Sequence, residues 1–404
     1  MILRCLAVLT VAALLLPVTA GAKPVEDRFT RLSRHLGPGD ALLITGANGR
    51  ALVSVNADRA IVPASTLKIL TALVAIEVLG PSYRFPTELF VDSLGNLFLK
   101  GYGDPLLISE TIAEMAVDAA ARLAPTNTVI ADLVVDDTFF NRPTIPGVIG
   151  SLEPYDAPNG AVCANFNTVH YATVNGRQVS AEPQTPLVDF ARRLIISHAP
   201  PQGRITLSHD ADAIALYAGH LLAHFLAREG IPVQGTIRRG TVTTGEAQLL
   251  TTYLSPFPLT RVVAKMLAFS NNFMANQLLI ASGANRFGSP GTLAKGVAAA
   301  VEIAQSRFGI KDLNLVEGSG ISRQNRIRAR DLDRILTAFA PYRNLLRSNG
   351  PERYKTGTLD GIRTRTGYFD TSSGETLQYV VFITGRGRTL NPVMVELRDL
   401  IGGE

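Results

Sequence analysis

The sequence predicts an α/β (α+β) fold, in which an antiparallel sheet is flanked by helices and interrupted by a large inserted α+β domain. Strand-like and helical segments occur near both ends of the chain, and the pattern changes character at about Thr87 before it returns after residue 254. We expect the strands of the two ends to share one sheet. We therefore assign residues 23–85 and 255–404 to one catalytic domain and residues 86–254 to an inserted accessory domain.

The composition is that of a globular protein. The chain has 404 residues, of which 46% are hydrophobic and 18% charged, and this length suits two or three domains. The formal net charge of +5 suits an anionic polymer such as a cell wall, or an outer-surface lipid. It is too weak to indicate a nucleic-acid partner.

The N-terminus has the features of a secretory signal peptide over residues 1–22. Arg4 supplies a positive start, an apolar run extends from Cys5 to Leu16, and Ala20-Gly-Ala22 is typical of a cleavage site. The alternative is an uncleaved anchor, but the run of about 12 apolar residues is shorter than the ~20 that span a bilayer. We therefore expect an exported protein, periplasmic or extracytoplasmic.

Cys163 is the one cysteine left after removal of the signal peptide. A single thiol forms no internal disulfide, and its neighbours Ala161, Val162 and Ala164 are apolar. We expect a buried, unreactive thiol and a fold stabilised by packing.

The elements before the insertion begin with a hairpin and end with a helix. Two strands flank Gly46-Ala-Asn-Gly49, a turn sequence. Pro63 precedes a helical run that Gly80-Pro81 ends, so Ser65 is expected at a helix N-terminus with Lys68 one turn further on. The predicted ranges are strands 41–45 and 51–55 and helix 65–79.

The insertion is expected to have its own α+β core. Ser109 and Asp212 are candidate N-caps, because each is a short polar residue directly before or at the start of a helical run. Proline- and glycine-rich loops fill 143–160. The predicted ranges are strands 87–92, 96–100 and 128–136 and helices 110–123 and 213–229.

The last part of the chain returns to helices followed by antiparallel strands. Hydrophobic periodicity indicates the helices, and Gly318-Ser-Gly320 indicates a turn between two of them. The predicted helices are 258–269, 273–284, 291–308, 329–339 and 392–401, and the predicted strands are 354–358, 362–369 and 378–384.

Ser65 and Lys68 are three residues apart, which places both side chains on one face of the expected helix. A serine hydroxyl needs a partner to remove its proton, and a lysine can do so when burial and neighbouring cations lower its pKa. The Ser65 N–H at the helix start can also bind a developing oxyanion. The alternative is a serine at a helix start with an exposed lysine.

Ser270-Asn-Asn272 interrupts two helical runs. A polar triplet at this place can be a simple helix break or cap. In the functional interpretation, Ser270 passes a proton to a leaving amine. Asn272 then donates a hydrogen bond to the substrate's amide carbonyl and holds Lys68 in position.

Lys355-Thr-Gly-Thr358 opens a predicted strand. Lys355 and the hydroxyls of Thr356 and Thr358 can bind a carboxylate. Gly357 has no side chain, so we expect a peptide to lie close against the strand, and the Thr358 N–H is a second candidate oxyanion donor. The alternative is an edge strand that carries lysine against aggregation.

The three motifs, in this order and on these elements, resemble those of the serine penicillin-binding enzymes and β-lactamases. Within that group the chain resembles the class C low-molecular-mass penicillin-binding proteins, the D-alanyl-D-alanine carboxypeptidase/endopeptidases. The resemblance covers nearly all of residues 26–390 and departs from the family at Glu317, where an Asp is usual, and at Tyr354, where a small residue is frequent. It includes Gly101-Tyr-Gly-Asp-Pro105, Val135-Asp-Asp-Thr-Phe-Phe140, Pro154-Tyr-Asp-Ala-Pro158, Asn165-Phe-Asn167 and Glu317-Gly-Ser-Gly-Ile-Ser322.

The resemblance implies a serine β-lactamase/transpeptidase-like fold and a serine-type D-Ala-D-Ala carboxypeptidase, with endopeptidase action on cross-links as an addition. Ser65 would attack the penultimate D-alanine of a peptidoglycan stem peptide, and β-lactam antibiotics would acylate the same serine as covalent inhibitors. The alternatives are a β-lactamase-like serine hydrolase and a penicilloyl sensor or wall-binding protein that processes no peptide. The oligomeric state and the deacylation base stay open.

No cofactor and no metal are expected. His220 and His224 lie four residues apart on a predicted helix, but no acidic or cysteine partner stands at ligand spacing, so a structural or surface role is favoured. No G-x-S-x-G elbow occurs, and no histidine lies near the three motifs, which excludes an obvious Ser-His-Asp triad.

Overall fold

The computed structural model describes residues 29–126, 129–195, 199–243 and 245–402. The expected signal peptide, residues 1–22, lies outside these ranges. Among the described residues, no helix is long and apolar enough to cross a membrane.

The two ends of the chain share one antiparallel sheet, as the sequence predicted. Within the described residues, six strands follow the order β13-β14-β15-β16-β1-β2. The N-terminal hairpin joins the C-terminal strands through β1 and β16, where Ala41 faces Phe382. The bounds are β1 Ala41–Thr45, β2 Ala51–Val55, β13 Arg347–Asn349, β14 Glu352–Leu359, β15 Ile362–Asp370 and β16 Thr376–Thr384.

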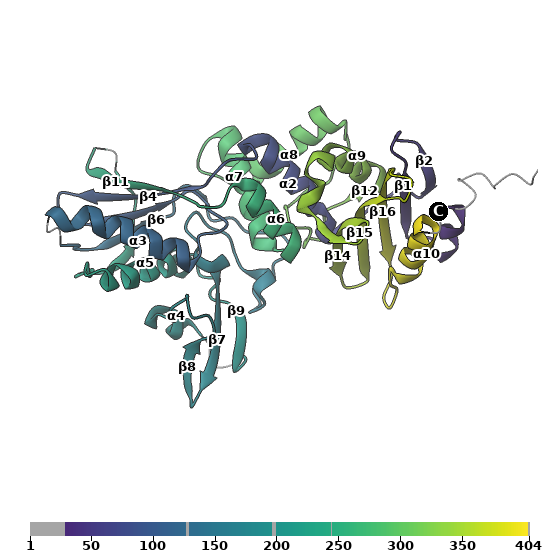
Figure 1. The fold of residues 1–404 in the computed structure, drawn as a ribbon. Helices are drawn as coiled ribbons and strands as arrows, with labels where there is room; N and C mark the ends of the chain where they lie inside the picture. Colours follow the sequence, from purple (N-terminus) through teal and green to yellow (C-terminus); the bar gives the residue numbers. More distant parts are fainter. Residues whose placement is uncertain (1–28, 127–128, 196–198, 244, 403–404) are drawn as a thin grey trace, which may run out of the picture.

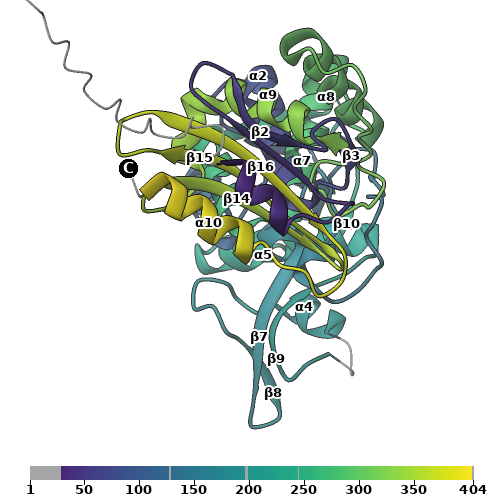
Figure 2. The same cartoon turned by 90° about the vertical axis from the view of Figure 1, so that its right-hand side faces the viewer.

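Helices cover both faces of this sheet, and Figure 2 shows α10 on one face and α9 and α2 on the other. Alternate residues of β16 divide between the two cores: Val380 and Phe382 pack under α2, α7 and α9, whereas Val381 and Ile383 pack under α10. The helices are α2 Lys68–Leu79, α6 Leu259–Phe269, α7 Asn272–Phe287, α8 Leu293–Phe308, α9 Ala329–Phe339 and α10 Asn391–Gly402.

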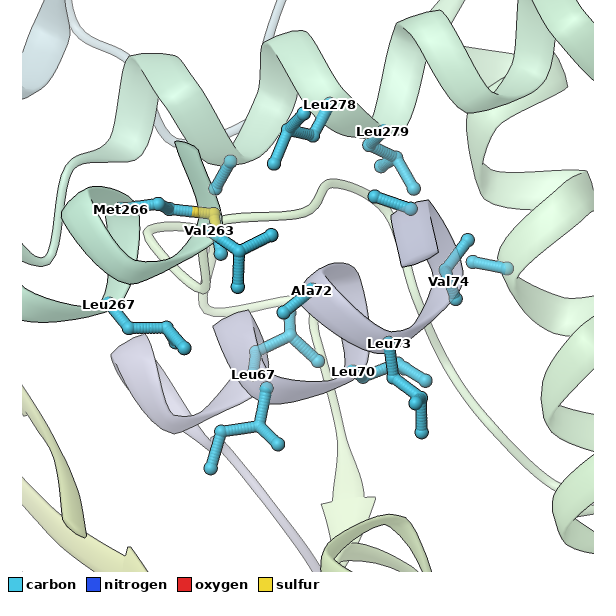
Figure 3. Close-up of a cluster of buried hydrophobic side chains, with 14 of the residues drawn as sticks. Leu67, Leu70, Ala72, Leu73, Val74, Val263, Met266, Leu267, Leu278 and Leu279 are labelled. Carbon is cyan, nitrogen blue, oxygen red and sulfur yellow. The ribbon is translucent and has the colours of Figure 1, made fainter. Parts of the chain in front are cut away.

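Helix α2 lies at the centre of the larger core. It is buried on nearly all sides, and Figure 3 shows Leu70 and Leu73 of α2 within the cluster to which Val263 of α6 and Leu278 of α7 also belong. A helix that is apolar all round must be enclosed by other elements. The start of α2 at Lys68, together with the turn that carries Ser65 directly before it, is therefore enclosed by the domain.

The middle of the chain forms a second core. Within its described residues, a five-stranded sheet has the order β10-β6-β5-β4-β11, and α3 and α5 pack against it. A separate three-stranded sheet, β8-β7-β9, projects beside α4 (Figure 1). The bounds are β4 Pro86–Asp92, β5 Leu97–Gly101, β6 Leu133–Asp136, β7 Thr168–Val174, β8 Arg177–Ser180, β9 Gln202–Thr206, β10 Ile237–Arg239, β11 Ala247–Leu254, α3 Ser109–Leu123, α4 Asp189–Leu194 and α5 Ala211–Arg228.

Short elements connect these units. A two-stranded ladder joins the segment before Ser65 to the segment before α9, with Ile61 opposite Ile327. The bounds are β3 Ala60–Ile61, β12 Ile327–Arg328 and the 3₁₀ turns η1 Arg31–His35, η2 Ala64–Leu67, η3 Ala124–Thr126, η4 Pro154–Asp156, η5 Ala164–Asn167 and η6 Ala340–Leu345.

Several predicted details were wrong. The N-cap of α3 is Ile108 and not Ser109, whose N–H is taken by the Asn165 side chain. The N-cap of α5 is Asp210, whose carboxylate accepts from the Ala213 N–H, and not Asp212. The strand expected at 128–136 begins only at Leu133.

The three-stranded sheet and strands β10 and β11 were missed. For β7 and β8 the sequence carries a signal, because Asn175-Gly176 connects them with positive φ at both positions. Such a pair between two strands is typical of a two-residue hairpin. For β9 to β11 the alternation is too weak to separate them from loops.

The enclosed position of α2 gives a stability prediction. Leu278→Ala should lower the free energy of unfolding by about 2–5 kcal/mol, because Leu278 is fully buried against this helix and the neighbours cannot fill the space. Urea unfolding measures the change. Leu94→Ala, at a side chain that is 77% exposed, is the control and should change it by less than about 0.5 kcal/mol. Equal effects of the two variants would contradict the packing described above.

Candidate active site

Ser65 lies on a tight turn and not inside a regular α-helix. The 3₁₀ turn η2 spans Ala64–Leu67, and α2 begins at Lys68, so the predicted helix start was three residues too early. Ala64 has a φ of 48°, in the left-handed region that non-glycine residues rarely adopt. Hydroxyls of Thr66 and Thr364 both donate to the Pro63 carbonyl and fix the chain before the turn.

Lys68 is fully buried directly beneath Ser65. Its Nζ lies 2.9 Å from Ser65 Oγ, 2.8 Å from Asn272 Oδ1 and 2.6 Å from the Ser319 carbonyl oxygen. Burial lowers the pKa of Lys68 well below its ordinary value, and the charge of Lys355 lowers it further, whereas Glu317 raises it. The site therefore makes Lys68 easier to deprotonate than a lysine in water.

The three neighbours of Lys68 suit a neutral amine. Two of them, the Asn272 side-chain oxygen and the Ser319 carbonyl, can only accept hydrogen bonds. When both take an N–H of a neutral amine, the nitrogen lone pair is left for the third neighbour, the Ser65 hydroxyl. The geometry thus places the Lys68 nitrogen, as a proton acceptor, within hydrogen-bond distance of the Ser65 hydroxyl.

Ser270 and Asn272 occupy the turn between α6 and α7. Ser270 ends α6 with a left-handed φ of 53°, and the Asn271 side chain caps α7 by accepting from the Met274 N–H. Asn272 Oδ1 then contacts Lys68, and Ser270 Oγ accepts from Lys355 Nζ at 2.8 Å. One turn thereby contacts both lysines.

Lys355 lies on β14 and is almost fully buried. Its Nζ donates to Ser270 Oγ and, at 2.7 Å, to the Thr356 carbonyl oxygen. Burial and then the nearby Arg347 guanidinium lower the pKa of Lys355 to about 8. The ladder with β13 ends at Tyr354, so the β14 edge from Lys355 onward has no strand partner on that side in the described chain.

The structure shows a close contact at Gly357 that the sequence did not predict. A Cβ at Gly357 would lie 2.7 Å from the Ser65 nitrogen and 2.9 Å from the Ala64 Cβ. Glycine at this position therefore lets β14 approach the Ser65 turn, in addition to the Thr364 hydroxyl of the neighbouring strand. Thr356 is half-buried and Thr358 is exposed on the same strand, and the hydroxyls of both hydrogen-bond to no other described residue.

Sequence reasoning missed the support beneath Lys68, the loop 317–322. The buried Glu317 carboxylate accepts from the backbone N–H groups of Ser319 and Gly320 and from the side chains of Asn276 and Asn325. These bonds hold the loop so that the Ser319 carbonyl reaches Lys68. The sequence signals were the Gly318-Ser-Gly320 turn and the resemblance over residues 317–322, neither of which indicated that the Glu317 carboxylate is buried.

Gly320 fits this loop against the Ser65 turn. Its φ is 82°, and a Cβ there would lie 1.9 Å from the Ala64 carbonyl oxygen. Only glycine allows this contact. The loop and the turn that carries Ser65 are consequently packed backbone to backbone.

The inserted segment reaches the same site. Asn272 Nδ2 donates to the Tyr155 carbonyl oxygen at 3.2 Å, and a Cβ on Gly147 would lie 2.9 Å from the Ser322 Cα. The proline- and glycine-rich stretch 143–160 therefore forms one side of the site, next to loop 317–322.

Other candidate groups lie elsewhere. His220 stacks on the Phe190 ring at 4.2 Å between centroids, and burial lowers its pKa to about 4. Cys163 is buried, and burial raises the pKa of its thiol. In the described ranges, no group of three or more His, Cys, Asp and Glu side chains is arranged to hold a metal ion.

Comparison with known proteins identifies relatives over most of the chain. The model of the D-Ala-D-Ala carboxypeptidase 3 (S13) family matches residues 41–201 and 192–349. A D-alanyl-D-alanine carboxypeptidase from Actinomadura sp. (strain R39) is 26% identical over 413 residues, which cover 83% of this chain and 75% of the relative.

Two solved structures of penicillin binding protein 4 from Haemophilus influenzae share the fold. The first matches with a TM-score of 0.75 and 21% identity over 92% of this chain and 98% of that one. The second, complexed with a β-lactam, matches with a TM-score of 0.70 and 22% identity over the same shares. The predicted fold class is thus confirmed.

The buried carboxylate beneath the site gives a second stability prediction. Glu317→Gln should lower the free energy of unfolding by about 1.5–3 kcal/mol, because an amide NH₂ would face donors that the carboxylate now accepts from. Thermal or urea unfolding measures the change. Glu302→Gln, which alters an exposed pair with Arg286, is the matched control and should stay within about 0.5 kcal/mol. If Glu317→Gln lowered the free energy of unfolding no more than Glu302→Gln does, the Glu317 carboxylate would not be what holds loop 317–322.

Proposed function

This chain belongs to the D-Ala-D-Ala carboxypeptidase 3 (S13) family, and from that membership we propose that it is a serine-type carboxypeptidase that removes the terminal D-alanine from peptidoglycan stem peptides through an acyl-Ser65 intermediate. The observation that carries the proposal is the buried Lys68 amine, held 2.9 Å from Ser65 Oγ by two groups that only accept hydrogen bonds. A lysine whose pKa is lowered by burial and by a neighbouring cation can act as the base that a serine nucleophile needs.

In the first step, Ser65 Oγ attacks the carbonyl carbon of the penultimate D-alanine while its proton passes to Lys68 Nζ. The carbonyl oxygen gains the negative charge, and the backbone N–H groups of Ser65 and Thr358 are the proposed donors that stabilise it. The contact between Gly357 and the Ser65 nitrogen brings the two donors to neighbouring positions.

In the second step, the bond from that carbon to the nitrogen of the terminal D-alanine breaks. Ser270 gives its proton to the departing amine and is reprotonated through Lys355 or solvent, which the 2.8 Å contact between Lys355 Nζ and Ser270 Oγ supports. The carboxylate of the leaving D-alanine is held by Lys355 with the hydroxyls of Thr356 and Thr358. Water then attacks the acyl ester: its oxygen bonds to the acyl carbon, the bond from that carbon to Ser65 Oγ breaks, Ser65 Oγ takes back the proton held by Lys68, and the proton lost by the water passes to solvent.

The same groups account for β-lactam antibiotics as covalent inhibitors. A β-lactam carries a carboxylate beside a strained amide. Its carboxylate can therefore bind Lys355, Thr356 and Thr358 while its amide acylates Ser65 in place of the peptide. The relative in complex with a β-lactam has the same fold. Together with the signal-like N-terminus, this supports an exported, periplasmic or extracytoplasmic enzyme whose partner is peptidoglycan.

Benzylpenicillin tests the nucleophile. Intact-mass measurement after incubation should show one adduct on the parent chain and none on Ser65→Ala, because the acyl bond requires the Ser65 oxygen. Ser319→Ala, a serine in the same site whose side chain contacts no lysine in the described structure, is the matched control and should still form the adduct. An adduct on Ser65→Ala would overturn the assignment.

Turnover then separates the three functions considered from the sequence. Release of free D-alanine from a stem-peptide mimic, together with slow loss of the penicilloyl adduct, identifies the carboxypeptidase. Rapid release of penicilloic acid identifies a β-lactamase, and a stable adduct without D-alanine release identifies a sensor.

The two lysines give a bell-shaped pH dependence of kcat/KM. As pH falls through the lowered pKa of Lys68, protonation removes the base and the rate falls. As pH rises through about 8, Lys355 loses the charge that holds the carboxylate, so kcat/KM falls again. The C-terminal methyl ester of the same peptide has no carboxylate and should lack the alkaline decline. An identical decline for both peptides would contradict the role of Lys355.

A further inference from the structure

A cavity of about 510 Å³ lies beside the turn that carries Ser270 and Asn272. It is bounded by the end of α6 and the start of α7 on one side and by residues of the inserted segment on the other. Volumes of this size are typical of small-molecule sites, which often form where two structural units meet. We call it the α6–α7 pocket; the lining residues that matter here are Phe269, Asn271, Lys265, Glu110, Gln184 and Phe166.

The charges of the α6–α7 pocket cancel. Glu182 and Arg204 form an ion pair with each other. Glu110 and Lys265 also line it; Lys265 Nζ lies over the Phe257 ring at 6.0 Å from its centroid, and within the described chain neither side chain has an ion-pair or hydrogen-bond partner. A site with balanced charge and unused donors and acceptors favours a neutral ligand rich in hydroxyl and amide groups over an anionic or cationic one.

Amide groups add to this polar lining. Asn271 uses its side-chain oxygen to cap α7, so its NH₂ group remains available. Gln184 is exposed at the rim and hydrogen-bonds through its side chain to no other described residue. Both can pair with hydroxyl or acetamido groups.

An exposed aromatic ring supplies the apolar part. Phe269 is 75% exposed although it ends a well-packed helix, and a large apolar side chain left in solvent beside a cavity indicates a contact surface. The C–H face of a sugar ring packs against the electron-rich face of an aromatic ring. Phe257 and Met274 extend the apolar surface inside.

Hydrogen bonds fix the wall of the pocket that the inserted segment supplies. Phe166 lies in a run of three left-handed residues, Asn165, Phe166 and Asn167. Asn165 holds this run in place, because its side chain accepts from the Ser109 N–H and donates to Ser109 Oγ, both at 2.9 Å. The pocket therefore keeps its shape without a ligand, which lowers the cost of binding.

We propose that the α6–α7 pocket binds an N-acetylated sugar unit of the peptidoglycan glycan strand. The inference rests on the proposed function, since the same polymer carries the stem peptide to Ser65. One backbone turn separates the pocket from the catalytic groups, with Asn271 in the pocket and Ser270 and Asn272 at the two lysines. A strand held there would deliver its attached peptides to the site and favour polymeric over free peptide.

The test uses the full chain with Ser65→Ala, which cannot turn over, and an N-acetylglucosamine tetramer as the probe. Saturation-transfer NMR and calorimetric titration should detect binding of the tetramer and weaker binding of a glucose tetramer, which lacks acetamido groups. Phe269→Ser should weaken binding of the first probe by about tenfold. Phe287→Ser, at a 45% exposed ring at the other end of α7, is the matched control and should leave it unchanged.

Activity measurements with Ser65 intact keep the two proposals apart. Phe269→Ser should raise KM for glycan-linked peptide about tenfold and leave D-alanine release from a free stem peptide and penicillin acylation unchanged. Failure of the parent chain to be acylated would refute the proposed function without bearing on sugar binding. Absence of tetramer binding, equal binding of both tetramers, or equal binding by Phe269→Ser and Phe287→Ser would overturn the sugar site.

Discussion

The arrangement of the site depends on one buried amine, that of Lys68. An amine removed from water is costly unless it finds hydrogen-bond partners inside the protein. Here the Lys68 nitrogen contacts an oxygen of Ser65 in turn η2, one of Asn272 at the start of α7 and one of Ser319 in loop 317–322. Three segments that are far apart in sequence must therefore arrive together before the amine is enclosed.

This requirement explains residues that never touch a substrate. Glu317 holds the loop that presents the Ser319 carbonyl, and Gly320 lets that loop contact the Ser65 turn directly. Gly357 does the same for β14 from the other side. The turn that carries Ser65 is thus packed between a loop and a strand, each by way of a glycine, and its unusual Ala64 backbone is held by both contacts.

Much of the fold could be predicted because its signals are local. Hydrophobic periodicity located the helices of the C-terminal part to within a few residues, and the hairpin 41–55 was correct. The motifs also located the groups that the structure brings together at Lys68 and Lys355, although their individual roles remain predictions. What sequence could not show depends on distant partners: the Ser109 hydroxyl is engaged by the Asn165 side chain, and Gly357 lies against the Ser65 turn. No pattern within either segment records such contacts.

The shared sheet has a consequence for how the chain acquires its structure. Asp40, just before β1, accepts from the Thr384 N–H, and the two residues are 344 positions apart in sequence. Loop closure over such a separation is entropically costly and slow, so folding of this sheet has a high contact order. Strand β1 waits unpaired on that edge until β16 has been synthesised. A ribosome-bound or truncated chain that ends before β14 thus holds Ser65 and Lys68 but lacks Lys355, so the arrangement around the two lysines is among the last features that the polypeptide completes.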